Sequence, residues 1–263
     1  MRIIDQMQRT VELAAPAQRI ISLVPSQTEL LFAIGAGESV VGLTKFCTEP
    51  PSLVGAVAKV GGTKKFDFGA IAALKPDLII GNKEENYLEG IEQLAKDYPI
   101  WMSDIVTLED SLEMIRGIGV VSGREDAANQ MADTIFTRFD ALESSSHAAF
   151  DRVNVAYLIW QKPYMAAGGG TFIDDVLKCG GMQNVLAERD RYPEVTLDEL
   201  ANSTAEVILL SSEPFPFRDK HLEALQSELP NKKILLVDAM PFSWYGSQLL
   251  RTPSYLRELR TKF

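Results

Sequence analysis

Residues 19–35 read Arg-Ile-Ile-Ser-Leu-Val-Pro-Ser-Gln-Thr-Glu-Leu-Leu-Phe-Ala-Ile-Gly. The apolar run Ile20–Val24 is typical of a short strand that is buried on both faces of a parallel sheet. Directly after it, Ser26-Gln27-Thr28-Glu29 has the pattern of a capping box, and the apolar residues that follow stop at Gly35. This stretch therefore predicts a strand, a tight turn and a helix.

Similar apolar runs recur along the chain and predict further strands. They lie at Val40–Leu43, Leu78–Ile80, Val153–Ile159, Val207–Leu210 and Ile234–Val237. Continuous apolar runs, as opposed to alternating ones, are typical of strands whose two faces are both covered by helices. We therefore predict an α/β fold with central, mostly parallel sheets.

The centre of the chain differs, because residues 107–150 contain no strand-like run and no proline. Ser122-Gly123 interrupts this segment. Beyond it, apolar residues recur every three to four positions, at Ala128, Met131, Ile135, Phe139 and Leu142. That spacing predicts one helix of about twenty residues, or about 30 Å.

These patterns together predict two lobes. Residues 1–106 would form an N-terminal α/β lobe, residues 107–150 a helical connector with one long backbone helix, and residues 151–263 a C-terminal α/β lobe. Residues 68–80 and 197–209 support this division, because each is a short helical segment that leads through a polar bend into a buried strand. A ligand is expected in a cleft between the lobes.

The composition sets limits on function. The 263 residues carry a net charge of −10, whereas nucleic-acid binders concentrate Lys and Arg on one face, so nucleic acid is not an expected partner. No apolar run approaches the roughly 18 residues of a membrane span. The first residues do not have the basic stretch and long apolar region of an export signal, so none is expected in this chain.

Cysteines, histidines and catalytic motifs indicate a binding protein. Cys47 and Cys179 lie far apart, and the two histidines, His147 and His221, lie among helix-forming residues. Neither a disulfide nor a cluster of metal ligands is expected. The sequence lacks the Gly-x-Ser-x-Gly elbow, the P-loop and His-Glu-x-x-His. We therefore predict a monomeric protein that binds a small molecule and is not an enzyme.

Gly168-Gly169-Gly170-Thr171 opens a predicted helix and has two interpretations. A glycine-rich turn before a helix binds phosphate in some folds. The spacing here fits neither the dinucleotide-binding nor the P-loop pattern, and Asp174 and Asp175 in the first helical turn would repel an anion. We favour a structural turn with close backbone approach.

Aromatic residues gather where the predicted strands end. Open α/β sheets bind ligands at the carboxyl ends of their strands, and aromatic rings there offer flat apolar surface to a large planar or macrocyclic molecule. The aromatic residues beyond predicted strands are Phe46, Trp160, Tyr164, Trp244 and Tyr245. Packing beneath loops is the alternative explanation for each ring taken singly.

Three stretches resemble successive motifs of the periplasmic binding proteins for vitamin B12 and ferric siderophores, which serve ABC importers. They are residues 19–32, quoted above, residues 73–80 (Ala-Leu-Lys-Pro-Asp-Leu-Ile-Ile) and residues 179–185 (Cys-Gly-Gly-Met-Gln-Asn-Val). The resemblance runs nearly end to end and in the same order. It implies two α/β lobes joined by one long helix, and delivery of the ligand to an importer.

The resemblance also implies a ligand and contact residues. B12 binders of this family hold the corrinoid mainly by apolar and aromatic contacts, which makes cobalamin the expected transported ligand, with no covalent cofactor and no metal bound by the protein itself. Ferric siderophore binders often add arginines, and haem binders a Tyr or His ligand. By position, the ligand-facing residues are Pro25, Ser26, Phe46, Trp160, Trp244 and Tyr245.

The sequence departs from the family pattern at one of the two positions that dock on the importer. Family members present an acidic residue from each lobe to the transporter, and Asp198 supplies the one from the second lobe. The first lobe has Gly69 at the matching place, and Asp67 is the candidate substitute. The alternatives are a ferric siderophore or haem binder of the same family, or a cytoplasmic corrinoid sensor or carrier. A periplasmic or cell-surface location follows from the resemblance alone.

Overall fold

The computed structural model describes residues 1–149 and 152–263. The side chains of residues 145–149, His147 among them, lie outside the described part. The chain divides into two compact units. Unit 1 comprises Met1–Ile105, Glu109–Ile135 and Tyr245–Ser247, and unit 2 comprises Val106–Leu108, Phe136–Trp244 and Gln248–Phe263. The lobe boundaries expected from the sequence stay a prediction.

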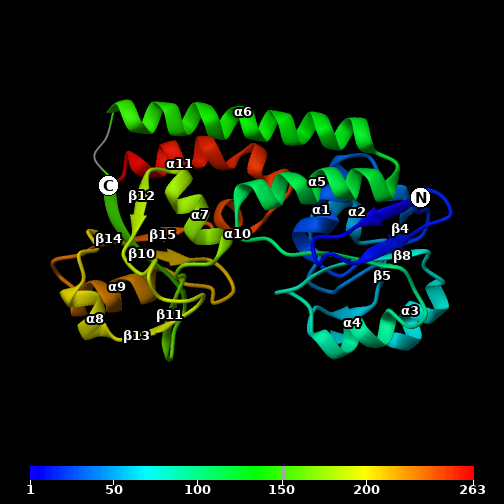
Figure 1. The fold of residues 1–263 in the computed structure, drawn as a ribbon. Coiled ribbons are helices and arrows are strands. Elements are labelled where there is room, and N and C mark those ends of the chain that lie inside the picture. The colour runs from blue at the N-terminus through cyan, green and yellow to red at the C-terminus, as the bar shows by residue number, and fades with distance from the viewer. Residues whose placement is uncertain (150–151) are drawn as a thin grey trace. The chain divides into compact units, whose positions relative to one another are not determined.

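Unit 1 contains a five-stranded parallel sheet in the order β5-β4-β3-β8-β9. Figure 1 labels β4, β5 and β8 of this sheet. Its strands are β3 (Ile20–Ser22), β4 (Val40–Leu43), β5 (Ala58–Lys59), β8 (Leu78–Asn82) and β9 (Ile100–Ser103). Two antiparallel pairs accompany the sheet: β1 (Arg2–Ile4) with β2 (Thr10–Glu12), and β6 (Gly61–Gly62) with β7 (Lys65–Phe66). The predicted strands of this half are confirmed.

Helices cover both faces of this sheet because successive strand residues point to opposite sides. Ile79 of β8 packs with Ile71 of α3 (Phe68–Leu74) and Ile91 of α4 (Leu88–Leu94) on one face. On the other face, Trp101 of β9 lies against Gly117, where an added Cβ would come within 2.8 Å of the indole. The other helices of this half are α1 (Pro25–Ala33), η1 (Gly37–Ser39), α2 (Pro51–Val54) and α5 (Leu108–Ser122).

Unit 2 contains a second sheet, in the order β13-β11-β10-β14-β15, with β12 paired to β10 off this path. Strands β10, β12, β14 and β15 run parallel, while β11 is antiparallel to β10 and β13. Their bounds are β10 (Val153–Trp160), β11 (Tyr164–Ala166), β12 (Met182–Asn184), β13 (Glu194–Val195), β14 (Val207–Ser211) and β15 (Lys233–Val237). The predicted strands of this half are confirmed as well.

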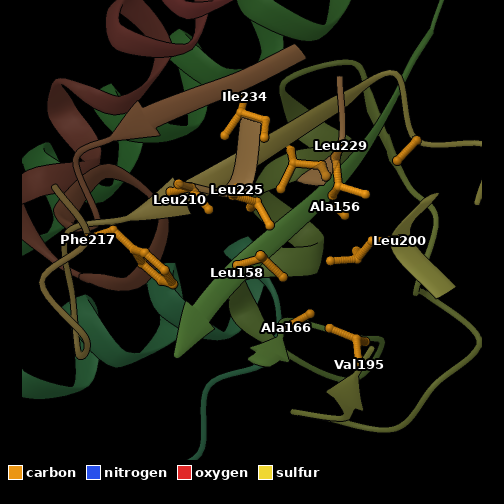
Figure 2. Packing of buried hydrophobic residues seen from close by; sticks show 12 residues of the cluster. Ala156, Leu158, Ala166, Val195, Leu200, Leu210, Phe217, Leu225, Leu229 and Ile234 are labelled. Carbon is orange, nitrogen blue, oxygen red and sulfur yellow. The ribbon is translucent and has the colours of Figure 1, made fainter. Parts of the chain in front are cut away.

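The core of unit 2 lies between this sheet and two helices, α8 (Leu197–Asn202) and α9 (Asp219–Glu228). Figure 2 shows Leu158 and Leu210 of the sheet packed toward Leu200 of α8 and Leu225 of α9. The opposite face meets α10, where the Tyr157 and Phe242 rings lie 5.0 Å apart. The other helices here are α7 (Phe172–Cys179), α10 (Met240–Ser243), η2 (Ser247–Leu250) and α11 (Thr252–Arg260).

The predicted long helix is α6 (Glu125–Ala149), which follows α5 after a left-handed turn at Gly123 (φ 67°). Its apolar stripe is buried at Ala128, Ile135, Phe139 and Leu142. Met131 is only half-buried. The boundary between the two units falls inside this helix, after Ile135. Within the described part of the chain, no helix is long and apolar enough to cross a membrane.

The predicted capping box at Ser26 is wrong. Helix α1 begins at Pro25, its N-cap is Val24, and no side chain caps it. Proline at the first helical position has its φ already fixed and lacks an N–H that would need a partner. Pro25 therefore starts the helix two residues earlier than the pattern of polar residues indicates, because the N-cap is Val24 and not Ser26. The end at Gly35 (φ 81°) is confirmed.

The glycine-rich turn before α7 is structural, as the spacing indicates. The N–H of Gly168 donates to the carbonyl of Arg191 (2.7 Å), and that of Gly169 donates to the carbonyl of Arg189 (2.8 Å). A Cβ at Gly169 would lie 2.1 Å from the carbonyl oxygen of Ala187. The helix is capped by Thr171, whose hydroxyl accepts from the N–H of Asp174 (3.2 Å).

We expect Gly169→Ala to lower the free energy of unfolding by about 1–3 kcal/mol, because its methyl group would collide with backbone that is held by hydrogen bonds. Gly69→Ala is the matched control. Gly69 is exposed within α3, and the nearest atom to an added Cβ is 3.5 Å away, so this change should be neutral or stabilising by up to about 1 kcal/mol. Urea denaturation measures both. Equal free energies of unfolding for the two variants would contradict the close contact between Gly169 and the carbonyl of Ala187.

Candidate functional site

The candidate site in unit 2 lies at the carboxyl ends of three neighbouring parallel strands. Trp160 is the last residue of β10, Glu213 and Phe215 follow β14, and Trp244 follows β15 and the short helix α10. Because β14 pairs with both β10 and β15 in parallel, the segments after the three strands leave the same edge of the sheet. Trp160 is one of the few large apolar side chains that stay exposed, at 40%.

An aromatic cluster surrounds Trp160. Its ring meets that of Phe215 edge-on, with centroids 5.6 Å apart. Phe215 also contacts Phe217 at 4.8 Å and the imidazole of His221 at 5.1 Å. Edge-to-face geometry is a favoured arrangement of aromatic rings, so these contacts hold Trp160 at the edge of the sheet.

His221 is a structural element of this cluster. Its Nδ1 accepts a hydrogen bond from the backbone N–H of Arg218 (2.9 Å) at the start of α9. Loss of hydration, and then the charges of Lys220 and Arg218, lower the pKa of the imidazole. The neutral ring therefore caps the helix through Nδ1.

A chain of polar groups anchors the loop after β14. The buried Tyr157 hydroxyl donates to Ser211 Oγ (3.0 Å), which donates in turn to the carbonyl of Glu213 (2.7 Å). Burial raises the pKa of Tyr157 well above its usual range, so the phenol stays protonated. The N–H of Phe215 donates to the carbonyl of Ile159 (3.2 Å). The backbone that carries Glu213 and Phe215 is thus tied to two strands.

Trp244 is joined to the same loop through its indole. The indole N–H donates to Oε2 of Glu213 at 3.4 Å, which is a long hydrogen bond. Trp244 thus contacts Glu213, and Trp160 contacts Phe215, so both tryptophans lie against the segment 213–215. Tyr164, by contrast, packs against the core of unit 2, and its hydroxyl accepts from Gln161 Nε2 (3.2 Å).

The expected residues of unit 1 fall into two groups. Pro25 and the buried Ser26 form the first turn of α1, and the segment with Tyr245 lies against them, since a Cβ at Gly246 would come within 3.2 Å of the Ser26 carbonyl. Phe46 follows β4, is 52% exposed, and has the ammonium of Lys45 5.0 Å from its ring centre.

Two predicted site residues that are adjacent in the sequence are assigned to different units. Trp244 belongs to unit 2 and Tyr245 to unit 1. Glu213 and Phe215 were not among the predicted site residues. Their signal was present, because they follow the buried strand Val207–Ser211 just as Trp160 ends its own strand. Ligand contact by the predicted residues stays a prediction.

The two predicted docking acids occupy different positions on their helices. Asp198 is exposed at the second residue of α8, which Thr196 and Glu199 cap. Asp67 is the N-cap of α3, and its Oδ1 accepts from the N–H of Ala70 (2.9 Å). Gly69 is the second residue of α3, so it occupies the place that Asp198 occupies on α8.

Among the described residues, no three His, Cys, Asp or Glu side chains are grouped so that they could hold a metal ion. Cys47 is buried in unit 1, Cys179 lies in unit 2, and both are free thiols. Burial raises the pKa of both, that of Cys179 to about 12.

The sequence pattern of the periplasmic binding protein family matches residues 20–231. This chain belongs to that family. Its members are non-enzymatic ligand binders. Over 250 residues it is 25% identical to a vitamin B12-binding protein of Vibrio parahaemolyticus, a match that covers 94% of this chain and 90% of that protein.

Solved structures share the fold. The periplasmic vitamin B12 binding protein BtuF of Vibrio cholerae matches with a TM-score of 0.79 and 23% identity, over 93% of this chain and 98% of that one. The periplasmic heme-binding protein RhuT of Roseiflexus matches with a TM-score of 0.77 and 22% identity, over 93% and 97%. The chain therefore has the fold of family members that bind different ligands.

We expect Ser211→Ala to destabilise the protein by about 1–3 kcal/mol, because the buried Tyr157 hydroxyl would lose its partner. Tyr157→Phe should cost less, about 0.5–1.5 kcal/mol, since Ser211 keeps its bond to Glu213. Ser227→Ala, at an exposed serine of α9, is the control. Urea denaturation compares the three. If Tyr157→Phe lowered the free energy of unfolding more than Ser211→Ala does, the proposed series of hydrogen bonds from Tyr157 through Ser211 to Glu213 would be wrong.

Proposed function

We propose that this protein captures a corrinoid, with cobalamin as the leading candidate, for an ABC importer. The observation that carries the proposal is the group of aromatic side chains at the carboxyl ends of β10, β14 and β15. Trp160 and Phe215 contact each other, and Trp244 is joined to their loop through Glu213. Two indoles and a phenyl ring offer broad apolar surface, which suits a large ring system.

The relatives support a corrinoid over other ligands. A vitamin B12-binding protein matches along 94% of the chain, while the likeness to haem-binding proteins is one of fold. Haem iron is held in proteins by axial side-chain ligands such as His or Tyr. His221 uses Nδ1 to cap α9, and Tyr164 packs against the core. Haem and ferric siderophores remain the alternatives that the binding experiment has to separate.

The finer assignments follow from this proposal. Pro25, Ser26, Phe46 and Tyr245 would contact the ligand from unit 1, and Trp160 and Trp244 from unit 2. Docking through Asp198 and Asp67, a monomeric state and a periplasmic location complete the proposed role. The cytoplasmic sensor or carrier is the competing role, and it predicts the same ligand without an importer.

Titration with cyanocobalamin, haemin and a ferric hydroxamate siderophore tests the ligand class. We expect saturable one-to-one binding of cyanocobalamin, measured by calorimetry and by intrinsic tryptophan fluorescence corrected for absorption by the ligand. Trp160 is partly exposed at the edge of the sheet, so the ligand should quench it. Binding of haemin or of the siderophore in place of cyanocobalamin would overturn the proposal.

Alanine substitution of the two tryptophans tests the site. Trp160→Ala and Trp244→Ala should each weaken cyanocobalamin binding by about 1–3 kcal/mol, because central aromatic anchors carry much of the energy of a binding surface. Phe136→Ala is the matched control, since Phe136 is an aromatic residue that is 58% exposed on α6 and is not one of the proposed contact residues. Unchanged affinity in both tryptophan variants, or an equal loss in the control, would show that the site is misplaced.

A further inference from the structure

Glu213 is the carboxylate that reaches the aromatic group in unit 2. It is exposed, it lies two residues before Phe215, and its Oε2 accepts from the indole of Trp244. Asp238, which follows β15 at the same edge, is a second acid, and its carboxylate accepts from the backbone N–H of Met240 (3.1 Å). An acidic side chain beside apolar contacts has little effect on the affinity for an apolar ring. It disfavours ligands that carry negative charge near it.

The position of Glu213 is fixed by the fold. Its carbonyl accepts from Ser211 Oγ (2.7 Å), and Ser211 is itself bonded to the buried Tyr157 hydroxyl. Two residues on, the N–H of Phe215 donates to the carbonyl of Ile159 (3.2 Å). The backbone on either side of this carboxylate is therefore held to the sheet.

The carboxylate has capacity for further hydrogen bonds. An ionised carboxylate accepts at about four lone-pair positions, and the indole of Trp244 takes one of them. Amide N–H groups on the rim of a ligand fit the remaining positions. Carboxylate groups on the rim of a ligand do not fit these positions. They have no proton to donate, and their negative charge is repelled by that of Glu213.

We infer that Glu213 is a specificity-determining residue that selects a ligand with an uncharged, amide-bearing rim and rejects ligands whose rim carries carboxylates. This inference rests on the proposed function and refines it. Cobalamin carries primary amides around the corrin ring, whereas haem carries two propionates. The discrimination comes from repulsion of the wrong ligand as well as from hydrogen bonds to the right one.

The experiment compares cyanocobalamin with a cyanocobalamin monocarboxylate, in which one peripheral propionamide has been hydrolysed, and with haemin. Calorimetry at low ionic strength gives the ratio of the affinities. The test variant is Glu213→Gln, whose Oε1 still accepts from Trp244 while the charge is gone. The control is Glu206→Gln, the same change at the exposed amino end of β14, where the carboxylate accepts from the N–H of Asn154.

We expect the wild-type protein to prefer cyanocobalamin over the monocarboxylate. Glu213→Gln should reduce this preference by about three- to tenfold, as expected for removal of one partly screened like charge. The same variant should bind haemin more tightly than the wild type does. Glu206→Gln should keep the wild-type ratio, and added salt should narrow the difference between the wild type and Glu213→Gln.

The outcomes separate the inference from the proposed function. If cyanocobalamin binds and Glu213→Gln leaves the affinity ratio unchanged, the inference is overturned and the proposed function stands. If Glu206→Gln changes the ratio as much as Glu213→Gln does, the effect belongs to net charge and the inference also fails. If the wild-type protein does not bind cyanocobalamin, the proposed function is overturned, and the inference with it.

Discussion

The parallel pairing of β14 between β10 and β15 is the constraint on which the candidate site depends. Leu210 of β14 faces Leu158 on one side and Leu236 on the other, so all three strands end at nearly the same level. Neighbouring strands lie about 4.8 Å apart. The residues that leave these ends therefore meet at ring-contact distance, and Trp160 and Phe215 do so at 5.6 Å. In another strand order these aromatic residues would be scattered.

Hydrogen bonds between buried polar groups of this apolar sheet fix the path of the loop that follows β14. Tyr157 and Ser211 are both fully buried on adjacent strands, and a buried hydroxyl without a partner is costly. Each satisfies the other, and Ser211 passes the hydrogen bond on to the backbone of Glu213. The requirement to satisfy two buried hydroxyls thus fixes where the loop leaves the sheet.

The sequence predicts the elements better than the contacts between them. Apolar runs such as Val207–Leu210 identified the strands, and the stripe through Ile135 and Phe139 identified α6, because burial on both faces or on one stripe leaves a periodic signal. The start of α1 was misplaced because Pro25, and not Ser26, sets it. The sequence places Glu213 just after a predicted strand, but its contact with Trp244 depends on which strands are neighbours, and a single sequence does not reveal that order.

Membership of the periplasmic binding protein family narrows the function to ligand binding, and the chemistry of the loops has to decide the ligand. Chains with this fold bind vitamin B12 in one relative and haem in another, so the shared sheets and helices do not discriminate between these molecules. Both ligands offer a broad ring to aromatic side chains such as Trp160. They differ in the charge on their rims, and Glu213 places a carboxylate beside the rings of unit 2. Under the proposed function, the aromatic surface would bind a macrocycle, and the charge beside it would decide which macrocycle binds.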